Sequence, residues 1–362
     1  MKKKLAILLA AAMTLSLMAG CGPKDKGSAS SGSASTPPAA SSQPSGDVSE
    51  PGGDTSQNEG ETEDSVKFMV MSGPTGVGAA RMITAPVLNP EPKVTYECSV
   101  VTDNSEVMNA LINGDADIAA VATNVAANLV NKTNGGVQVL AINTLGVLYI
   151  LEKGDTVHTM SDLRGKTLMA PSTAKGANPE YILNYLLEEN DVDPSEVNIE
   201  WLTPQEITAK MASSEEGVCM LPVPAATALL IKDSGVREAV SLSAEWDKLE
   251  NGALAQGCIV ARTDFVEENP EVVESFLLSY EASIAYMKDE ANRAEAAELV
   301  AQCGITANAA IAARAIPQCN LTYITGSEMK DILQEFYQIM FQADPKSIGG
   351  AMPYDSFYYG AE

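Results

Sequence analysis

The stretch K-T-L-M-A-P-S-T-A-K-G-A-N-P-E-Y-I-L, residues 166–183, contains the structural unit from which we expect this chain to be built. Its first five residues, Lys166–Ala170, form a short apolar run that is typical of a buried strand. A polar loop follows, and Asn178 before Pro179 places a capping residue ahead of a first-turn proline, which predicts the start of a helix. That helix has one apolar face, formed by Ile182, Leu183, Leu186 and Leu187.

The same strand-then-helix unit recurs on both sides of this stretch, from Val66 onward. The other apolar runs of strand length are Lys67–Met71, Val94–Val101, Asp117–Ala122, Val137–Ile142, Asn198–Leu202, Val218–Pro222 and Cys258–Arg262. Thr203 and Glu206 have the spacing of a capping box, and Asn269 before Pro270 begins a segment that is mostly helical to about Ala343. Alternating strands and helices predict the α/β class with largely parallel sheets.

An internal similarity links two parts of the chain. Residues 106–130 align without a gap onto residues 206–230, and their apolar patterns agree although few positions are identical. Two explanations remain open: two similar lobes, or the general likeness of any two α/β units. In the first case Thr123-Asn124 and Val223-Pro224 are equivalent strand-to-helix loops. Because ligands bind outside the carboxyl ends of strands in open α/β sheets, these loops then line a cleft between the lobes.

Two glycine-containing loops have the composition of ligand-binding loops. In S-G-P-T-G-V-G-A-A, residues 72–80, glycines let the backbone approach a ligand, and N–H groups at a helix start favour an anion or a polar group. Neither nucleotide-binding pattern fits, because no Gly-Lys-Ser/Thr follows and Arg81 stands at the third glycine position of the dinucleotide motif. In the loop of residues 170–181, Ser172 and Thr173 offer hydrogen bonds and Lys175 offers a positive charge. The alternative for both loops is a plain turn.

Three further residues have simpler interpretations. Pro222 and Pro224 stiffen the exit of the strand at 218–222, which predicts a preformed wall. Trp246 provides either an aromatic face to the site or packing at its rim. His158 is expected in an exposed loop.

Composition excludes several classes of function. The chain has 362 residues and a formal net charge of -25, and sequence-independent binding of nucleic acid needs a basic surface. A single histidine, His158, excludes a metal site built on several histidines and argues against a histidine-based catalytic centre. We therefore expect no catalytic residue, no metal and no cofactor.

The N-terminus has the pattern of an export signal. Three lysines follow Met1, an apolar run extends from Leu5 to Met18, and the small residues Ala19-Gly20 precede Cys21. L-M-A-G-C resembles a bacterial lipobox, so we expect residues 1–21 to be a lipoprotein signal and Cys21 to be lipidated. Residues 22–65 are rich in Ser, Gly, Ala, Pro and Thr and then acidic, which predicts a disordered tether.

Five other cysteines remain. Cys98, Cys219 and Cys258 lie in apolar runs and are expected to be small buried hydrophobes. Cys303 and Cys319 flank a helical stretch, and both a disulfide and two free thiols remain open for them.

Several of these segments together resemble a known family, the substrate-binding lipoproteins of bacterial ABC transporters, in the branch that is similar to nitrate, sulfonate, taurine and thiamine-precursor binding proteins. The segments are the lipobox at Cys21, Asn113–Asn124, Ser161–Leu168, Met220–Ala228, and Cys258 through Asn269–Phe276. The resemblance implies a two-lobed periplasmic-binding-protein-like fold of type 2, with mixed sheets flanked by helices. Residues 66–148 plus 253–362 would form lobe I and residues 149–252 lobe II, with crossings near Leu145–Ile150 and Ala253–Cys258.

The resemblance also implies a function. The protein would be the extracytoplasmic solute-binding component of an ABC importer, monomeric, anchored to the cell membrane through Cys21, and served by a permease and an ATPase. Its small-molecule ligand would be bound by Ser72, Gly73, Pro74, Thr75, Gly76, Thr123, Asn124, Ser172, Thr173, Lys175, Gly176, Pro222 and Pro224. Lys175 is the only cation among them, which argues against strongly anionic ligands and leaves an aromatic or zwitterionic molecule open. The alternatives are a pyrimidine-synthase-like enzyme of the same fold and a ligand sensor without transport.

Overall fold

The computed structural model describes residues 64–84 and 94–361. The predicted signal, the lipidation site Cys21 and the tether up to residue 63 lie outside the described residues. The first strand begins at Asp64, inside the range predicted as tether, because Asp64 and Ser65 already pair with Val94 and Thr95. None of the helices within the described ranges is long and apolar enough to span a membrane.

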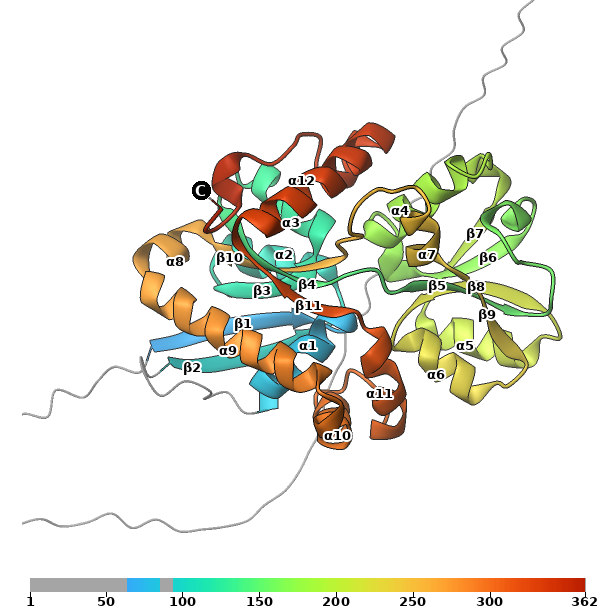
Figure 1. Cartoon of the computed structure of the whole chain (residues 1–362), viewed down its shortest axis with the longest axis horizontal. Coiled ribbons are helices and arrows are strands. Elements are labelled where there is room, and N and C mark those ends of the chain that lie inside the picture. The colour runs from blue at the N-terminus through green and yellow to red at the C-terminus, as the bar shows by residue number, and fades with distance from the viewer. Residues whose placement is uncertain (1–63, 85–93, 362) are drawn as a thin grey trace, which may run out of the picture. The chain divides into compact units, whose positions relative to one another are not determined.

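One lobe is built on a six-stranded sheet with the strand order β11-β4-β10-β3-β1-β2. Its strands are β1 (Asp64–Met71), β2 (Val94–Val101), β3 (Ile118–Ala122), β4 (Val137–Thr144), β10 (Gly257–Arg262) and β11 (Leu321–Ile324). One face is covered by α2 (Asn104–Asn113), α3 (Thr123–Lys132) and α12 (Gly326–Ala343). The other face is covered by α1 (Pro74–Thr84), α9 (Pro270–Lys288) and α10 (Arg293–Gln302), with α8 (Thr263–Glu268) and α11 (Ala309–Ala315) nearby (Figure 1).

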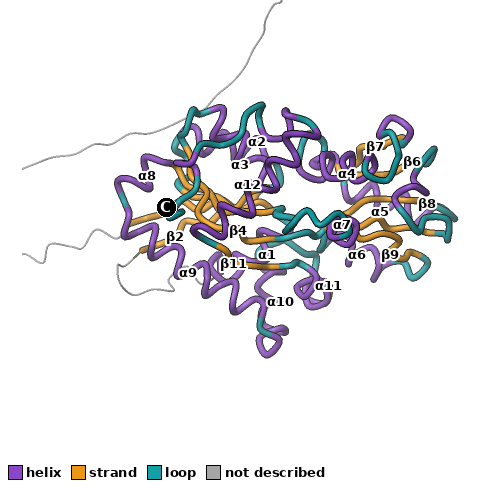
Figure 2. Tube along the Cα trace, turned by 45° about the horizontal axis from the view of Figure 1, so that its top comes forward, coloured by secondary structure: helices purple, strands orange, loops and turns teal. Residues whose placement is uncertain are grey.

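The second lobe is built on a five-stranded sheet with the order β7-β6-β8-β5-β9. Its strands are β5 (Leu148–Lys153), β6 (Thr167–Pro171), β7 (Asn198–Leu202), β8 (Gly217–Pro222) and β9 (Val236–Ser241). The helices α5 (Pro204–Ser213) and α6 (Ala225–Lys232) pack on one face, and α4 (Asn178–Glu188) and α7 (Leu242–Asp247) on the other (Figure 2). The Thr203–Glu206 capping box at the start of α5 is confirmed.

The internal similarity is structural. Strands β2-β1-β3-β10-β4 of the first sheet have the same order and the same relative directions as β7-β6-β8-β5-β9 of the second. Residues 106–130 run through α2, β3 and α3, and residues 206–230 run through α5, β8 and α6 at the same place in the other sheet. The shared apolar pattern therefore reflects two lobes of one topology.

The prediction of largely parallel sheets is wrong, and the expectation of mixed sheets is confirmed. Strand β10 runs antiparallel to β3 and β4, and β5 runs antiparallel to β8 and β9. Strand β11, at the edge of the first sheet, also runs antiparallel to its neighbour β4. The directions of β10 and β5 arise because the chain changes lobe twice. It leaves the first sheet after β4 and enters the second as β5, and it returns from α7 into β10, so each arriving strand runs against its neighbours. The connectors are residues 145–147 and 248–256.

A contiguous apolar core extends from one lobe to the other at these connectors. Trp246 of α7 is completely buried there, with its ring centroid 5.4 Å from that of Tyr185 in α4 and 5.8 Å from that of Phe336 in α12. Its indole N–H donates to the carbonyl of Gly252 at 3.2 Å. Trp246 is thus a packing residue between the lobes and contributes no aromatic face to a ligand site.

A disulfide between Cys303 and Cys319 is not formed, because both residues are free thiols. The Cys319 Sγ lies 3.3 Å from the carbonyl oxygen of Ala315, whereas the Cys303 Sγ lies 3.8 Å from that of Ala80. Cys219 and Cys258 are buried as expected, and Cys98 is half-buried. Burial raises the pKa of the Cys219 and Cys319 thiols to about 12, so both behave as small hydrophobes.

Candidate functional site

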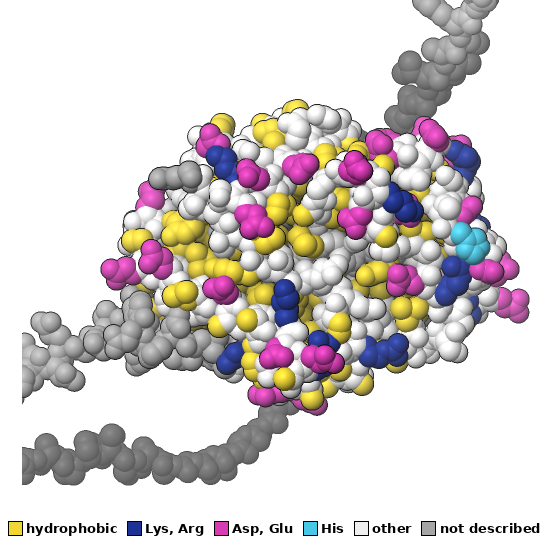
Figure 3. Space-filling view, in the orientation of Figure 1, with side chains coloured by type: hydrophobic (Ala, Val, Ile, Leu, Met, Phe, Trp, Pro, Cys, Tyr) yellow, Lys and Arg dark blue, Asp and Glu magenta, His cyan; other side chains and the backbone are white. Residues whose placement is uncertain are grey.

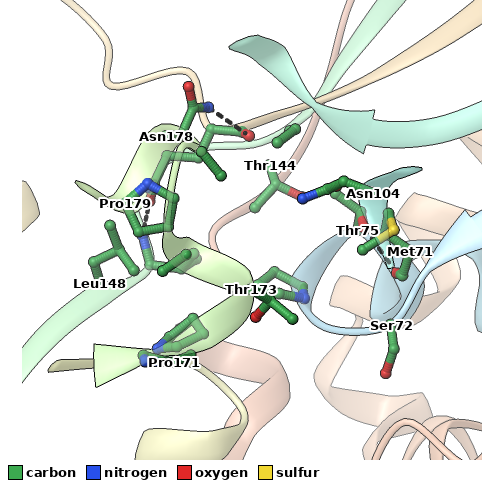
Figure 4. A pocket seen from close by; sticks show the side chains of 18 of the residues that line it. Met71, Ser72, Thr75, Asn104, Thr144, Leu148, Pro171, Thr173, Asn178 and Pro179 are labelled. Carbon is green, nitrogen blue, oxygen red and sulfur yellow. Dashed lines mark hydrogen bonds between the residues drawn. The ribbon is translucent and has the colours of Figure 1, made fainter. Parts of the chain in front are cut away.

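Three adjoining cavities lie between the two lobes. The central cavity has a volume of about 150 Å³ and is lined from both sides, by residues such as Ser72 and Thr144 from the six-stranded lobe and Pro171 and Thr173 from the five-stranded lobe (Figure 4). Thr173 also lines both neighbouring cavities. The three cavities therefore adjoin one another as one crevice, in which the central cavity has the smallest volume of the three.

The flanking cavities differ in charge. The lysine cavity, of about 510 Å³, has Lys132, Lys175 and Lys346 among its lining residues. The proline cavity, of about 550 Å³, is lined by uncharged residues that include Pro204, Pro222 and Pro224. Sequence reasoning missed Lys132 and Lys346, because both come from parts of the chain that the folded structure alone brings beside Lys175.

Most of the residues predicted to bind a ligand line this crevice. Ser72, Gly73, Pro74, Thr75, Asn124, Ser172, Thr173, Lys175, Gly176, Pro222 and Pro224 each border at least one of the three cavities. Gly76 and Thr123 border none of them. The two loops after β1 and β6 therefore face each other across the crevice, as expected from their positions at the carboxyl ends of equivalent strands.

Gly76 is needed for packing. A Cβ atom at this position would lie 2.9 Å from the Cδ1 of Ile305 and 3.0 Å from the carbonyl oxygen of Met71. Because both distances are shorter than ordinary contacts, a larger residue would require the Ile305 side chain and the backbone near Met71 to shift. The glycine thus allows the start of α1 to pack closely against Ile305 and the end of β1 in the same lobe.

Thr123 is a joint between the lobes. Its side chain is completely buried, and its hydroxyl donates to the carbonyl of Ala255 at 2.8 Å. The same hydroxyl accepts a hydrogen bond of 2.7 Å from the side-chain amide of Asn178, the first residue of α4 in the other lobe. The Thr123 N–H donates to the carbonyl of Gln256 at 3.2 Å. This residue therefore ties α3 to a connector and to α4.

Asn178 was expected to cap α4, and that prediction is wrong. The capping position is Ala177, which supplies no side-chain hydrogen bond. Asn178 instead uses its amide nitrogen across the lobe boundary, to Thr123 and, at 3.3 Å, to the carbonyl of Gln256. Its Oδ1 is buried without a partner, and the residue lines the central cavity. Asparagine before proline at a helix start is a common capping pattern, so local sequence rules did not indicate this contact between the lobes.

Two more polar residues of the central cavity were missed. Thr144, at the end of β4, is 1% exposed, and its hydroxyl has no hydrogen-bond partner among the described residues. Gln256, in the second connector, accepts a hydrogen bond of 2.6 Å from the N–H of Val147 in the first connector. The cavity is thus bordered by the segments through which the lobes are joined, so a molecule inside it contacts the parts that must move when the lobes move.

Carboxylates also lie at or near the residues that line the lysine cavity. Asp103 lines the cavity, and hydrogen bonds from the Ser105 side chain and N–H hold the pKa of this carboxyl below its usual range. Glu180 accepts from the N–H of Gly176, and Asp344 accepts from the N–H of Lys346. The mouth of the crevice therefore has mixed charge.

The single histidine lies away from the crevice. His158 is exposed, as expected, with its Nε2 3.5 Å from a carboxylate oxygen of Asp155. In Figure 3 the histidine, in cyan, lies at the outer edge of the molecule, amid acidic and basic side chains. Across the described ranges, no three His, Cys, Asp or Glu side chains cluster as a metal site would require.

Comparison with known proteins gives a family and several structural relatives. The family model described as "NMT1/THI5 like" matches residues 101–294. An ABC transporter structure from Parabacteroides distasonis is similar with a TM-score of 0.68 at 24% identity, covering 82% of this chain and 99% of that one. The periplasmic aliphatic sulphonate binding protein SsuA from Escherichia coli gives a TM-score of 0.65 at 15% identity, with 80% and 96% covered.

A third relative has the same fold and is described with zinc bound. It is the ligand-binding component of an ABC-type import system from Staphylococcus aureus, with zinc bound, and it gives a TM-score of 0.62 at 14% identity with 82% and 96% covered. No curated protein matches this chain. At these identities the solved structures establish the two-lobed fold.

Proposed function

Because this chain belongs to the NMT1/THI5-like family, we propose that it is the extracytoplasmic solute-binding component of an ABC importer, which captures a small organic molecule between its two lobes. The observation that carries this proposal is the central cavity. It is lined from both lobes and lies at the carboxyl ends of equivalent strands. Two buried polar atoms beside it, the Asn178 Oδ1 and the Thr144 hydroxyl oxygen, have no partner within residues 64–84 and 94–361. Buried polar groups are nearly always paired, so these two atoms are suited to a ligand.

Capture would use the motion that the topology permits. We assign residues 66–148 plus 253–362 to one moving body and residues 149–252 to the other, with residues 145–147 and 248–256 as the hinge. The predicted ligand-binding residues, except Gly76 and Thr123, then close on the molecule from both sides. Hinge closure around a ligand is a common response in two-lobed proteins of this kind.

The N-terminal segment would place the binder at the membrane. Lipidation of Cys21 and a free tether of residues 22–65 would hold the folded body near a membrane permease and its ATPase, which receive the ligand. Two acyl chains on one cysteine suffice for stable anchoring. We propose that the protein acts there as a monomer.

A binding role fits the described residues better than catalysis. The same-fold enzyme considered above consumes a histidine of its own, and His158 is exposed and borders none of the three cavities. The central cavity is lined by side chains that form hydrogen bonds and apolar contacts. Such side chains hold a molecule without activating it.

Native mass spectrometry of the mature chain after incubation with the small-molecule fraction of its culture medium tests the proposal. We expect the wild type to retain a compound. Thr173→Trp should retain none, because Thr173 is exposed and borders all three cavities, so the indole fills the crevice without disturbing the core. Ser234→Trp, in an exposed turn remote from the crevice, is the matched control and should bind as the wild type does. Retention by Thr173→Trp equal to that of the control would contradict the proposal.

A further inference from the structure

The central cavity has an unusually uniform chemistry for a site that is expected to hold a polar molecule. All nineteen of its lining residues are uncharged, and none is aromatic. Eleven are apolar, chiefly methionines, prolines and alanines, and seven carry hydroxyl or amide groups. A ligand here meets apolar contacts and neutral hydrogen-bonding groups, with no ring for it to stack on.

A charged group in this cavity would lack compensation from side chains. Removing an ion from water costs several kcal/mol or more unless an opposite charge or several hydrogen bonds replace the water. The three lysines of the neighbouring lysine cavity do not supply that compensation. They are exposed, none of them lines the central cavity, and the carboxylate of Asp103 lines the same cavity as they do.

The helix ends at the cavity do not supply it either. An anion at a helix start is bound by first-turn N–H groups, and proline has none. Pro74 is the first residue of α1 and Pro179 the second residue of α4, and both line the central cavity. The next two N–H groups of α4 donate to the carbonyl of Ala177. On the lining residues of α1 and α4, the N–H groups of Thr75 and Asn178 are left for a ligand. Asn104, the first residue of α2, also lines the cavity, but the carboxylate of Asp103 caps that helix start and disfavours an anion there.

The orientation of Asn178 favours a ligand that donates hydrogen bonds. Its nitrogen must face the carbonyl of Gln256, because a carbonyl oxygen only accepts. This fixes the amide and leaves Oδ1, an acceptor, as the buried atom without a partner. A deprotonated carboxylate or sulfonate offers acceptors alone and cannot satisfy it. An alcohol or an amide carries the O–H or N–H that it needs.

From these observations we infer that the molecule captured in the central cavity is uncharged and non-aromatic and carries hydrogen-bond donors, as in an alcohol, polyol or amide. This inference rests on the proposed solute-binding function and narrows its substrate class. It distinguishes the ligand of this protein from that of the aliphatic sulphonate binding relative, since a sulphonate is an anion.

The test uses the full mature chain and a mixture of matched compounds added to the small-molecule fraction of the culture medium. The mixture pairs an alditol with its aldonate, an aliphatic carboxamide with its carboxylate, and an alkanesulfonamide with its sulfonate. Bound compounds are released, identified by mass spectrometry, and sorted by charge at pH 7 and by ultraviolet absorption.

We expect the retained compounds to be uncharged and transparent in the near ultraviolet, with each charged member of a pair bound at least tenfold more weakly than its neutral counterpart. Retention of an anionic, cationic or aromatic compound that Thr173→Trp fails to retain would overturn the inference and leave the binding function standing. Retention of nothing from either source would overturn the proposed function, and the inference with it. The two failures are thus distinguishable.

Discussion

The side-chain amide of Asn178 donates a hydrogen bond of 2.7 Å to the hydroxyl of Thr123, and this contact joins the start of α4 in one lobe to the start of α3 in the other. Both side chains are almost completely buried, at 2% and 0% exposure. The carbonyls of Ala255 and Gln256, in the second connector, accept from the same two side chains. The joint therefore links both lobes and the hinge segment immediately beside the central cavity.

Replacing Thr123 should weaken the protein as a whole. Thr123→Val keeps the shape of the side chain but leaves the Ala255 carbonyl and the Asn178 amide without their partner. We expect the free energy of unfolding to fall by about 1–3 kcal/mol, measured by urea denaturation. A double-mutant cycle with Asn178→Leu should show a coupling of about 1 kcal/mol. Additive effects of the two substitutions would mean that the hydrogen bond contributes nothing.

Replacing Thr144 should weaken ligand binding and leave the stability of the fold intact. Its buried hydroxyl has no partner in the part of the chain that the structure describes, so Thr144→Val should leave the free energy of unfolding unchanged or slightly raised. Capture of the retained compound should weaken by about tenfold, since a hydrogen bond to the ligand is lost. Ser243→Ala removes another unpartnered hydroxyl outside the three cavities and serves as the control. If both variants bind equally well, Thr144 has no role in the site.

The stability of the second lobe should depend on the ionisation of Glu152. Burial acts to raise the pKa of this carboxyl, but hydrogen bonds from Thr156 and Val157 and the charge of Arg237 outweigh it, so the pKa lies below its ordinary value of 4.5. A group with a lowered pKa stabilises the fold above the ordinary value and loses this effect as the pH falls through the folded value.

Glu152→Gln should therefore be less stable than the wild type by about 1–3 kcal/mol at pH 7, because the substitution breaks these contacts. The difference should shrink as the pH is lowered below about 4.5, where the wild-type carboxyl becomes protonated. Urea denaturation over a pH series measures it. The exposed Glu215→Gln should follow the wild-type curve, and an equally large Glu152→Gln deficit at pH 3 and pH 7 would refute the assignment.

The thiols should be free and slow to react. We expect peptide mapping of the protein, unfolded and alkylated without a reductant, to find Cys303 and Cys319 each alkylated. In the native state Cys219 and Cys319 should resist alkylation at pH 8, because burial excludes the reagent and raises their pKa to about 12. A disulfide-linked pair of the peptides that contain Cys303 and Cys319 would contradict this arrangement.

Much of the fold follows from local patterns. The predicted strands all exist, with ends that agree within about three residues, because each is an apolar run bounded by turn residues. The strands β5, β9 and β11 were missed for different reasons. Residues 148–150 were assigned to a lobe crossing, β9 is an edge strand with two adjacent charged residues, Arg237 and Glu238, and β11 has only four residues.

The site was harder to predict, for a physical reason. The loops after β1 and β6 could be identified because glycine, serine and threonine after a strand indicate a ligand loop. Thr144, Gln256 and Asn178 have no such local pattern, since their importance comes from contacts between lobes and connectors that are distant in sequence. Local rules likewise gave no sign that the hydroxyl of Thr123 bonds to Ala255 and Asn178, two partners distant in sequence.

The central claim is that a small molecule is captured between the lobes, and thermal unfolding tests it most directly. With the small-molecule fraction of the culture medium at a hundredfold excess over the dissociation constant, binding adds about 2.7 kcal/mol, or roughly 4 °C in Tm for a folded body of this size. We predict that rise for the wild type and for Ser234→Trp, and none for Thr173→Trp. An equal shift in all three proteins, or a shift in none, would contradict the claim.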